Sequence, residues 1–190
     1  MTERLGVDQP RGMRWEERLL EVFDDLELQA EGLHLAERAA RVAELSPSEY
    51  AETVLSARLH ASVGCQVALF LGGSGSVEGV LANAGRDWVL VRHEHAETLV
   101  RTATVVRLRG ASGRSSPERT RSVTARLGLG SALRRLAAER ERVAVTLTGG
   151  DVVRGRLLRI GADFAELASE AGPVELVPFD GVVMLRRLLP

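Results

Sequence analysis

The sequence contains no lysine, a single cysteine and no hydrophobic run long enough to cross a membrane. All 25 cations are arginine, and together with abundant Ala, Gly, Val and Leu this skew is typical of GC-rich coding, not of a particular chemistry. The one cysteine, Cys65, excludes an internal disulfide framework. No apolar run approaches the roughly 20 residues that span a bilayer, and residues 1–12 lack the hydrophobic stretch of a signal peptide. These absences predict a cytoplasmic protein.

The chain has enough apolar residues to form a packed core. It has 190 residues, of which 45% are hydrophobic, and its mean hydropathy is −0.01. This length allows one large domain or two small ones, and the composition excludes a wholly disordered chain.

The charges are segregated along the chain although the net charge is only −1. Residues 1–57 carry 6 Arg against 13 acids, whereas residues 101–142 carry 11 Arg against 3 acids. An acidic head that complements a basic middle is one interpretation, and an anion-binding stripe is the other.

The acidic head is predicted to be helical. Apolar residues recur every three or four positions over 13–45, which is typical of an amphipathic helix, and residues 1–12 are predicted to be a disordered leader. Ser46 and Pro47 form a helix start signal, which predicts a second helix over 47–62. Its core-facing side chains are expected to be Tyr50, Val54, Leu55 and Leu59.

The strongest feature of the sequence is an internal repeat. Residues 67–109 and 143–186 align at an offset of 76, which becomes 77 after one inserted residue. The alignment matches aliphatic, glycine, aspartate and aromatic positions. In the first copy these are Val67, Leu69, Leu71, Gly73, Gly79, Leu81, Gly85, Asp87 and Trp88. In the second copy they are Val143, Val145, Leu147, Gly150, Gly155, Leu157, Gly161, Asp163 and Phe164. Each pair is 76 positions apart except Gly73 and Gly150, which are 77 apart.

Each copy is predicted to form five short strands preceded by a helix. In the second copy the helix is expected over about 132–141 with Ser131 as its cap, and the strands over 143–147, 153–160, 164–168, 175–178 and 182–187. The mid-strand glycines Gly79 and Gly155 indicate a sharp bend, as a small sheet needs when it curls onto itself. The fold class is therefore mainly β with α.

A helix followed by this pattern of apolar, Gly and Gly-x-Asp-aromatic residues resembles the Sm/LSm fold. The C-terminal stretch 177–186 also resembles the Sm-like domain of bacterial ribosome-maturation factors, and the Arg-Leu-Gly-Leu element at 126–129 resembles an uncharacterised actinobacterial family. The resemblance implies two tandem five-stranded Sm-like barrels. Because strand edges pair with neighbours in that family, it also implies that the barrels pair edge to edge and leave outer edges for a homo-oligomer.

Both copies depart from the nucleotide pocket of RNA-binding Sm proteins. Neither has an Asn soon after Asp87 or Asp163, and neither has the Arg-Gly pair before its last strand. The usual uridine recognition is therefore not expected.

The expected organisation is a leader (1–12), an acidic helical segment (13–57), a first barrel (58–110), a basic flexible linker (111–123) and a helix with a second barrel (124–190). Arginines between hydroxyl-bearing residues contact phosphate without reading sequence. The candidate nucleic-acid-binding residues are Arg107, Arg109, Arg114, Arg119, Arg121, Arg126, Arg134 and Arg135. No aromatic residue is interleaved with them in the sequence, which argues against base stacking.

No pattern in the sequence indicates catalysis, a metal or a cofactor. The segment from His93 to Glu97 lacks a third well-placed ligand and is predicted to be an exposed hairpin. Cys65 has no histidine base nearby, and residues 72–76 lack the Gly-Lys-Ser/Thr ending of a phosphate loop.

The leading hypothesis is a non-catalytic RNA- or nucleic-acid-associated module. A protein-interaction scaffold, for ribosome maturation or another assembly, with partners bound by the N-terminal helices, is the alternative. A DNA-binding transcriptional regulator has the least support because no recognition helix is evident.

Overall fold

The computed structural model describes residues 50–94, 96–116, 123–170 and 172–188. The predicted leader and almost all of the acidic helical segment lie outside these residues. The described chain is mainly β. Ten antiparallel strands form one open sheet, and two α-helices, α3 and α4, lie entirely within the described residues. None of its helices is both long and apolar enough to cross a membrane.

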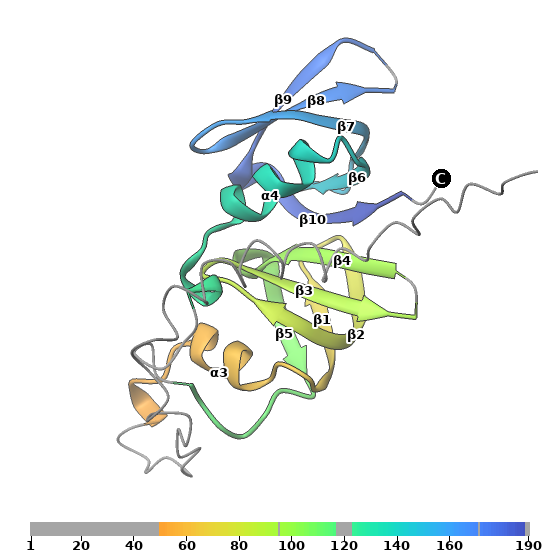
Figure 1. The fold of residues 1–190 in the computed structure, drawn as a ribbon. Coiled ribbons are helices and arrows are strands. Elements are labelled where there is room, and N and C mark those ends of the chain that lie inside the picture. Colours follow the sequence, from red (N-terminus) through yellow and green to blue (C-terminus); the bar gives the residue numbers. More distant parts are fainter. Residues whose placement is uncertain (1–49, 95, 117–122, 171, 189–190) are drawn as a thin grey trace, which may run out of the picture.

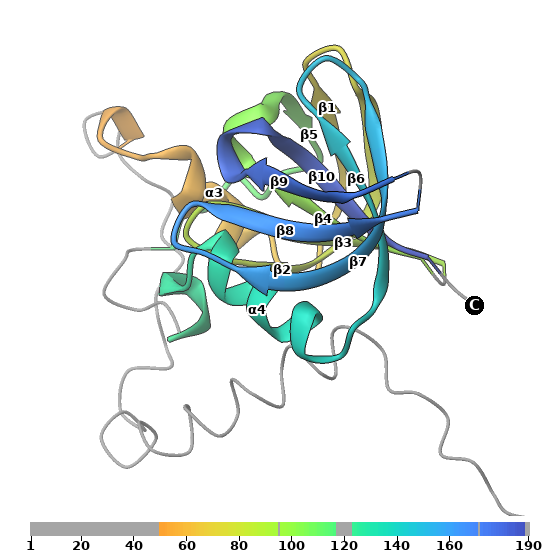
Figure 2. The same cartoon turned by 90° about the horizontal axis from the view of Figure 1, so that it is seen from above.

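The ten strands fall into two groups of five that follow one another along the chain (Figures 1 and 2). The first group follows helix α3 (Leu55–Ala61) and comprises β1 (Gln66–Leu71), β2 (Gly75–Ala84), β3 (Trp88–His93), β4 (Ala96–Arg101) and β5 (Val105–Arg109). The second follows helix α4 (Leu129–Ala138) and comprises β6 (Arg142–Leu147), β7 (Val152–Ile160), β8 (Phe164–Ser169), β9 (Val174–Pro178) and β10 (Val182–Arg187). The strand bounds predicted for the second copy agree with the observed ones to within one residue.

The internal repeat is also present in the backbone pairing. The sheet order is β5-β1-β2-β3-β4-β10-β6-β7-β8-β9, so each half has its fifth strand next to its first. The second and third strands of each half share a bulge at equivalent places, between Leu81 and Asn83 and between Leu157 and Arg159.

The two mid-strand glycines occupy equivalent close approaches. A Cβ on Gly79 would lie 2.2 Å from the Arg92 carbonyl oxygen, and a Cβ on Gly155 would lie 2.2 Å from the Ala168 carbonyl oxygen. Only glycine allows the neighbouring strand to approach this closely. These glycines were predicted to mark a sharp bend; the structure shows a close strand approach at each of them, and the bulges lie further along, after Leu81 and after Leu157.

The two halves are joined edge to edge, as expected. Strand β4 of the first half pairs with β10 of the second, with Leu99 opposite Leu185. We call this pairing the internal seam. Each half contributes to the other's core: Val183 of β10 packs in the cluster of the first half, whereas Trp88 and Leu99 pack in the cluster of the second half.

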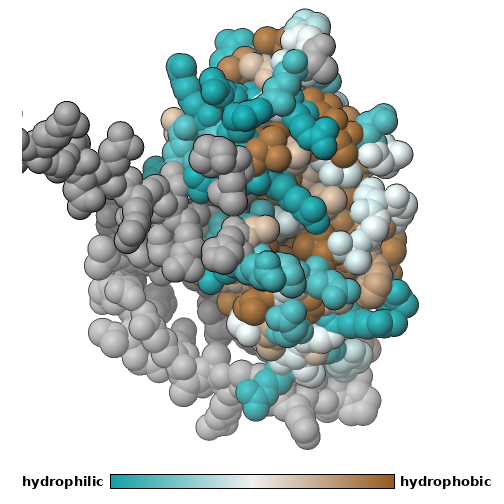
Figure 3. All heavy atoms as spheres, turned by 90° about the vertical axis from the view of Figure 1, so that its right-hand side faces the viewer, coloured by the Kyte–Doolittle hydropathy of each residue, from teal (hydrophilic) through white to brown (hydrophobic). Residues whose placement is uncertain are grey.

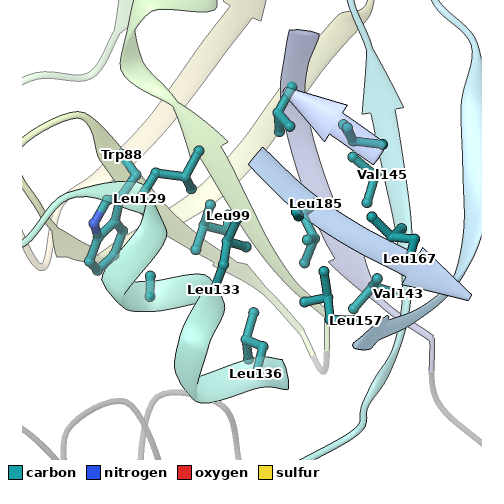
Figure 4. Close-up of a cluster of buried hydrophobic side chains, with 14 of the residues drawn as sticks. Trp88, Leu99, Leu129, Leu133, Leu136, Val143, Val145, Leu157, Leu167 and Leu185 are labelled. Carbon is teal, nitrogen blue, oxygen red and sulfur yellow. The ribbon is translucent and has the colours of Figure 1, made fainter. Parts of the chain in front are cut away.

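Helix α4 packs on the second half, mainly against β7, and its side chains share a core cluster with Trp88 and Leu99 of the first half. Its apolar face, formed by Leu129, Leu133 and Leu136, points toward Trp88 and Leu99 on one side (Figure 4). On its other side lie core residues of the second half, labelled in Figure 4 as Val143, Val145, Leu157, Leu167 and Leu185.

The start of α4 differs from the prediction. The helix begins at Leu129 instead of Ala132, and its N-cap is Gly128, which makes no side-chain cap. The Asp87 carboxylate accepts a hydrogen bond from the Leu129 backbone N–H at 2.7 Å instead. The cap therefore comes from a turn 42 residues away, which local sequence rules cannot identify.

The prediction of one helix over 47–62 is wrong in its extent and its buried face. Val54 has extended backbone dihedrals, so α3 starts only at Leu55. Of the four expected core side chains, only Leu59 is buried, while Tyr50, Val54 and Leu55 are exposed. The β-branched Val54 is better accommodated in extended backbone than in a helix.

Candidate functional site

The predicted arginines do not form a single cluster. Arg119 and Arg121 lie outside the described residues. Arg114, Arg126 and Arg134 are exposed on the connector, on the 3-10 turn Thr124–Arg126 and on α4. Arg135 makes an ion pair with Glu139 at 3.1 Å along α4.

Arg107 and Arg109 do lie together, and they share an aromatic partner. Their guanidinium carbons lie 3.7 Å and 5.1 Å from the centre of the Phe70 ring. Phe70 is opposite Arg107 in the β1–β5 pairing. No aromatic residue is interleaved with the candidate arginines in the sequence, but strand pairing brings Phe70 beside two of them from 37 positions away.

The first part of the predicted linker is attached to α3. The Ser112 backbone N–H donates to Ser62 Oγ at 2.9 Å, and the Ser112 carbonyl oxygen accepts from Arg58 Nε at 2.8 Å. The Ser116 N–H donates to the Ala57 carbonyl oxygen at 3.0 Å. These contacts hold residues 112–116 along the helix, while residues 117–122 lie outside the described chain.

A second group of arginines, which the sequence analysis missed, covers the outer side of the second half. Arg142 lies directly opposite Arg156 in the β6–β7 pairing. Arg154 and Arg186 both lie opposite Ala144, one from β7 and the other from β10. Since residues directly opposite one another, and residues two apart on a strand, share a face, all four arginines point to the same side. We call Arg142, Arg154, Arg156 and Arg186 the arginine face.

The arginine face is compact and open to solvent. All four residues are exposed, and two strand spacings place Arg154 roughly 10 Å from Arg186. Arg142 donates from Nε to Glu170 Oε1 at 2.9 Å. Among the described residues, no ion pair links the other three arginines to an acid. Three cations of this group are thus available to an anion as far as the described chain shows.

The fold does not require these arginines. At the equivalent places the first half carries Gln66 for Arg142, Glu78 for Arg154 and Val80 for Arg156, yet its strands pair in the same register. Only Arg186 has an arginine counterpart, Arg109. The sequence signal that could have revealed the group is the alternation Arg154-Gly155-Arg156, followed through the repeat.

A cavity of about 320 Å³ opens beside the arginine face. Arg186 lines it, together with the polar residues Ser76, Glu78, His93 and Thr98. Its remaining lining residues are Val77, Val91 and Ala96. The volume is at the lower end of small-molecule sites.

The structure also locates the metal, cysteine and glycine-rich candidates that the sequence analysis rejected. His93 and Glu94 are exposed at the β3–β4 hairpin, as predicted, while His95 lies outside the described residues. Cys65 is partly buried against the first core cluster, and residues 72–74 form a turn. In the described part of the chain no group of three or more His, Cys, Asp or Glu is placed to hold a metal ion.

Figure 3 shows the face of the molecule that lies on the right in Figure 1. Hydrophilic and hydrophobic side chains are mixed over it. No family model and no curated protein matches the chain, so its function must be argued from this geometry.

Proposed function

We propose that this chain is a non-catalytic module that associates with RNA or another nucleic acid and contacts its phosphate backbone through the arginine face. The observation that carries the proposal is the gathering of Arg142, Arg154, Arg156 and Arg186 on one exposed face. Guanidinium groups bind phosphate oxygens in a bidentate manner, and such contacts provide affinity without sequence readout.

The divergence of the two halves supports a binding role. Equivalent positions in the first half hold neutral or acidic residues in the same strand register, so the arginines add nothing that the fold needs. Clustering four like charges on adjacent strands is itself unfavourable. A polyanionic ligand would remove that cost.

We further propose that each five-stranded half is a small Sm-like barrel. The order fifth–first–second–third–fourth strand in both halves, the paired bulges and the preceding helix of each half support it. The arginine face is distinct from the uridine pocket, whose residues both copies lack, so we expect binding with weak base preference.

The test is a titration of nuclease-treated protein with mixed-sequence RNA and with duplex DNA at two salt concentrations. The key variant is Arg154→Gln, Arg156→Gln and Arg186→Gln together. The matched control is Arg114→Gln, Arg126→Gln and Arg134→Gln, which removes the same charge from exposed arginines elsewhere. Each lost phosphate contact should reduce the slope of log affinity against log salt by about 0.7–0.9.

We expect the key variant to lose about two to three units of this slope, and the control to lose less than one. Equal losses in both variants would show that charge alone acts, and the arginine face would have no special role. Absence of binding by the wild-type protein at low salt would overturn the proposal and leave the scaffold as the leading function.

The scaffold is kept as a second candidate because apolar side chains are exposed at both outer strands of the sheet. These are Val106 on β5, and Val174 and Leu176 on β9. Open strand edges with exposed apolar side chains can pair with another protein chain.

A further inference from the structure

The cavity beside the arginine face is lined by strands of both halves. Thr98 of β4 lies opposite Val91 of β3 and opposite Arg186 of β10. His93 and Ala96 lie opposite one another, two residues closer to the β3–β4 hairpin. Opposite residues, and residues two apart on a strand, share a face of the sheet. These five side chains therefore point to one side, where they line the cavity.

Strand β2 adds an apolar side chain to the cavity. Val77 is four residues before Leu81, which lies opposite Val91, so Val77 points to the same side as Val91. Val77 and Val91 are both buried in the core cluster of the first half. Ser76 and Glu78 also border the cavity, but the alternation along β2 turns their side chains to the other face. The floor of the cavity is thus apolar.

Three polar side chains of the cavity have no partner in the described chain. Among the described residues, no group forms a hydrogen bond or an ion pair with the side chain of Thr98, His93 or Arg186. Thr98 is only 4% exposed, and a buried hydroxyl without a partner is unfavourable. A ligand that accepts hydrogen bonds inside the cavity would remove this cost.

The second half lacks this set of polar residues. In the internal repeat Glu175 stands in the place of Thr98, and Ser169 in the place of His93. The third polar group, Arg186, reaches the cavity of the first half only because β10 pairs with β4. The site therefore exists only where the two halves are joined, and the repeated fold alone does not account for it.

We infer that this cavity binds a small monocarboxylate with a short aliphatic body. The Arg186 guanidinium carries paired N–H groups that match the two oxygens of a carboxylate, and the Thr98 hydroxyl can donate to the same group. The aliphatic body would pack against Val77 and Val91, which removes apolar surface from water.

The size and charge of the cavity limit the ligand. A volume of about 320 Å³ is at the lower end of small-molecule sites, which restricts the body to a few carbon atoms. Arg186 is the one arginine among the described residues that line the cavity. A phosphate dianion would bring a second negative charge without a second guanidinium to receive it, so a single carboxylate fits better.

The test is a titration of the full chain, freed of nucleic acid, with isovalerate. Heteronuclear NMR would follow the backbone amide signals, and calorimetry would give the affinity. We expect saturable shifts at Thr98 and Arg186, with a dissociation constant of about 0.1–1 mM. Isovaleramide, which has the same shape without the charge, should bind at least about 10-fold more weakly. Inorganic phosphate should not shift the Thr98 signal.

Three variants assign the contacts. Arg186→Gln should raise the dissociation constant about 10-fold or more, and Thr98→Val, which keeps the shape of threonine, about 3- to 5-fold. Ala96→Phe should abolish binding by filling the cavity without changing any charge. Ala96 is exposed, so this variant should remain folded, which circular dichroism would check.

Two matched controls separate the cavity from general charge effects. Arg134→Gln removes the same charge from an exposed site on α4, and Glu78→Gln changes a carboxylate that the strand alternation places on the other face. Each should change the dissociation constant for isovalerate by less than about 2-fold.

Several results would overturn this assignment. They are the absence of saturable shifts up to about 10 mM isovalerate, equally tight binding of isovaleramide or phosphate, and binding that persists in Ala96→Phe. An equal loss in Arg186→Gln and Arg134→Gln would show attraction to surface charge alone. Because the assay contains no nucleic acid, its failure would leave the proposed function standing, and failure of the proposed function would leave this site standing.

Discussion

Truncation of Leu99 tests how strongly the internal seam joins the two halves. Leu99 is fully buried between β10, α4 and the core of the second half. Leu99→Ala removes three carbon atoms from this packing and leaves a cavity where three elements meet. Its equivalent, Leu176, lies on the outer edge and is mostly exposed. The repeat therefore offers the same substitution in the same strand context, buried in one place and exposed in the other.

The expected loss follows from the burial. Full burial of a leucine side chain contributes about 1.5–3 kcal/mol, and the residual cavity raises the cost of Leu→Ala substitutions to about 2–5 kcal/mol. Because Leu99 is enclosed by a strand on one side and a helix on another, little collapse is expected, and we estimate about 3 kcal/mol. Leu176→Ala should change the free energy of unfolding by less than about 0.5 kcal/mol.

Equilibrium unfolding in guanidinium chloride measures both values. The protein should be dilute, because any self-association of folded chains would raise the apparent stability in a concentration-dependent way. A loss below about 1 kcal/mol for Leu99→Ala would mean that the seam does not contribute to stability. Equal losses for the two variants would refute the claim that the outer edge is uncovered in the monomer.

Two further substitutions test details of the fold. Asp87→Ala should lower the free energy of unfolding by about 1 kcal/mol, because the Leu129 N–H loses its hydrogen-bond acceptor. Thermal unfolding followed by circular dichroism should show a lower midpoint, and an unchanged midpoint would contradict the capping role. Gly79→Ala should lower the free energy of unfolding by about 3 kcal/mol, because its Cβ would collide with the Arg92 carbonyl oxygen. Gly113→Ala, which has open space around it, should be nearly neutral in the guanidinium chloride assay. Similar losses for the two variants would argue against a close strand approach at Gly79.

The repeat made much of the fold predictable. Alternating apolar residues such as Val143 and Val145 do face the core, because a strand with one buried face must place every second side chain inside. The aligned glycines fixed where the strands approach most closely. Edge-to-edge pairing followed from the resemblance and is observed between β4 and β10.

The contacts that depend on distant segments were not predictable from local patterns. The Asp87 cap of α4 joins residues 42 positions apart, and Phe70 reaches Arg107 only through the β1–β5 pairing. The arginine face arises because three strands align in one register, a property that requires the pairing partners to be known. Charge totals along the chain directed attention to residues 101–142, whereas three of the four clustered arginines lie beyond that stretch.

The exchange of side chains across the internal seam has a consequence for how the chain folds during synthesis. The first half cannot complete its core until Val183 arrives with the last strand. Residues 110–181 separate β5 from β10, and their synthesis takes roughly 4–14 seconds at about 5–20 residues per second. Throughout that interval β4 presents an open edge carrying Leu99 and Val100, the kind of nascent-chain intermediate on which chaperones act.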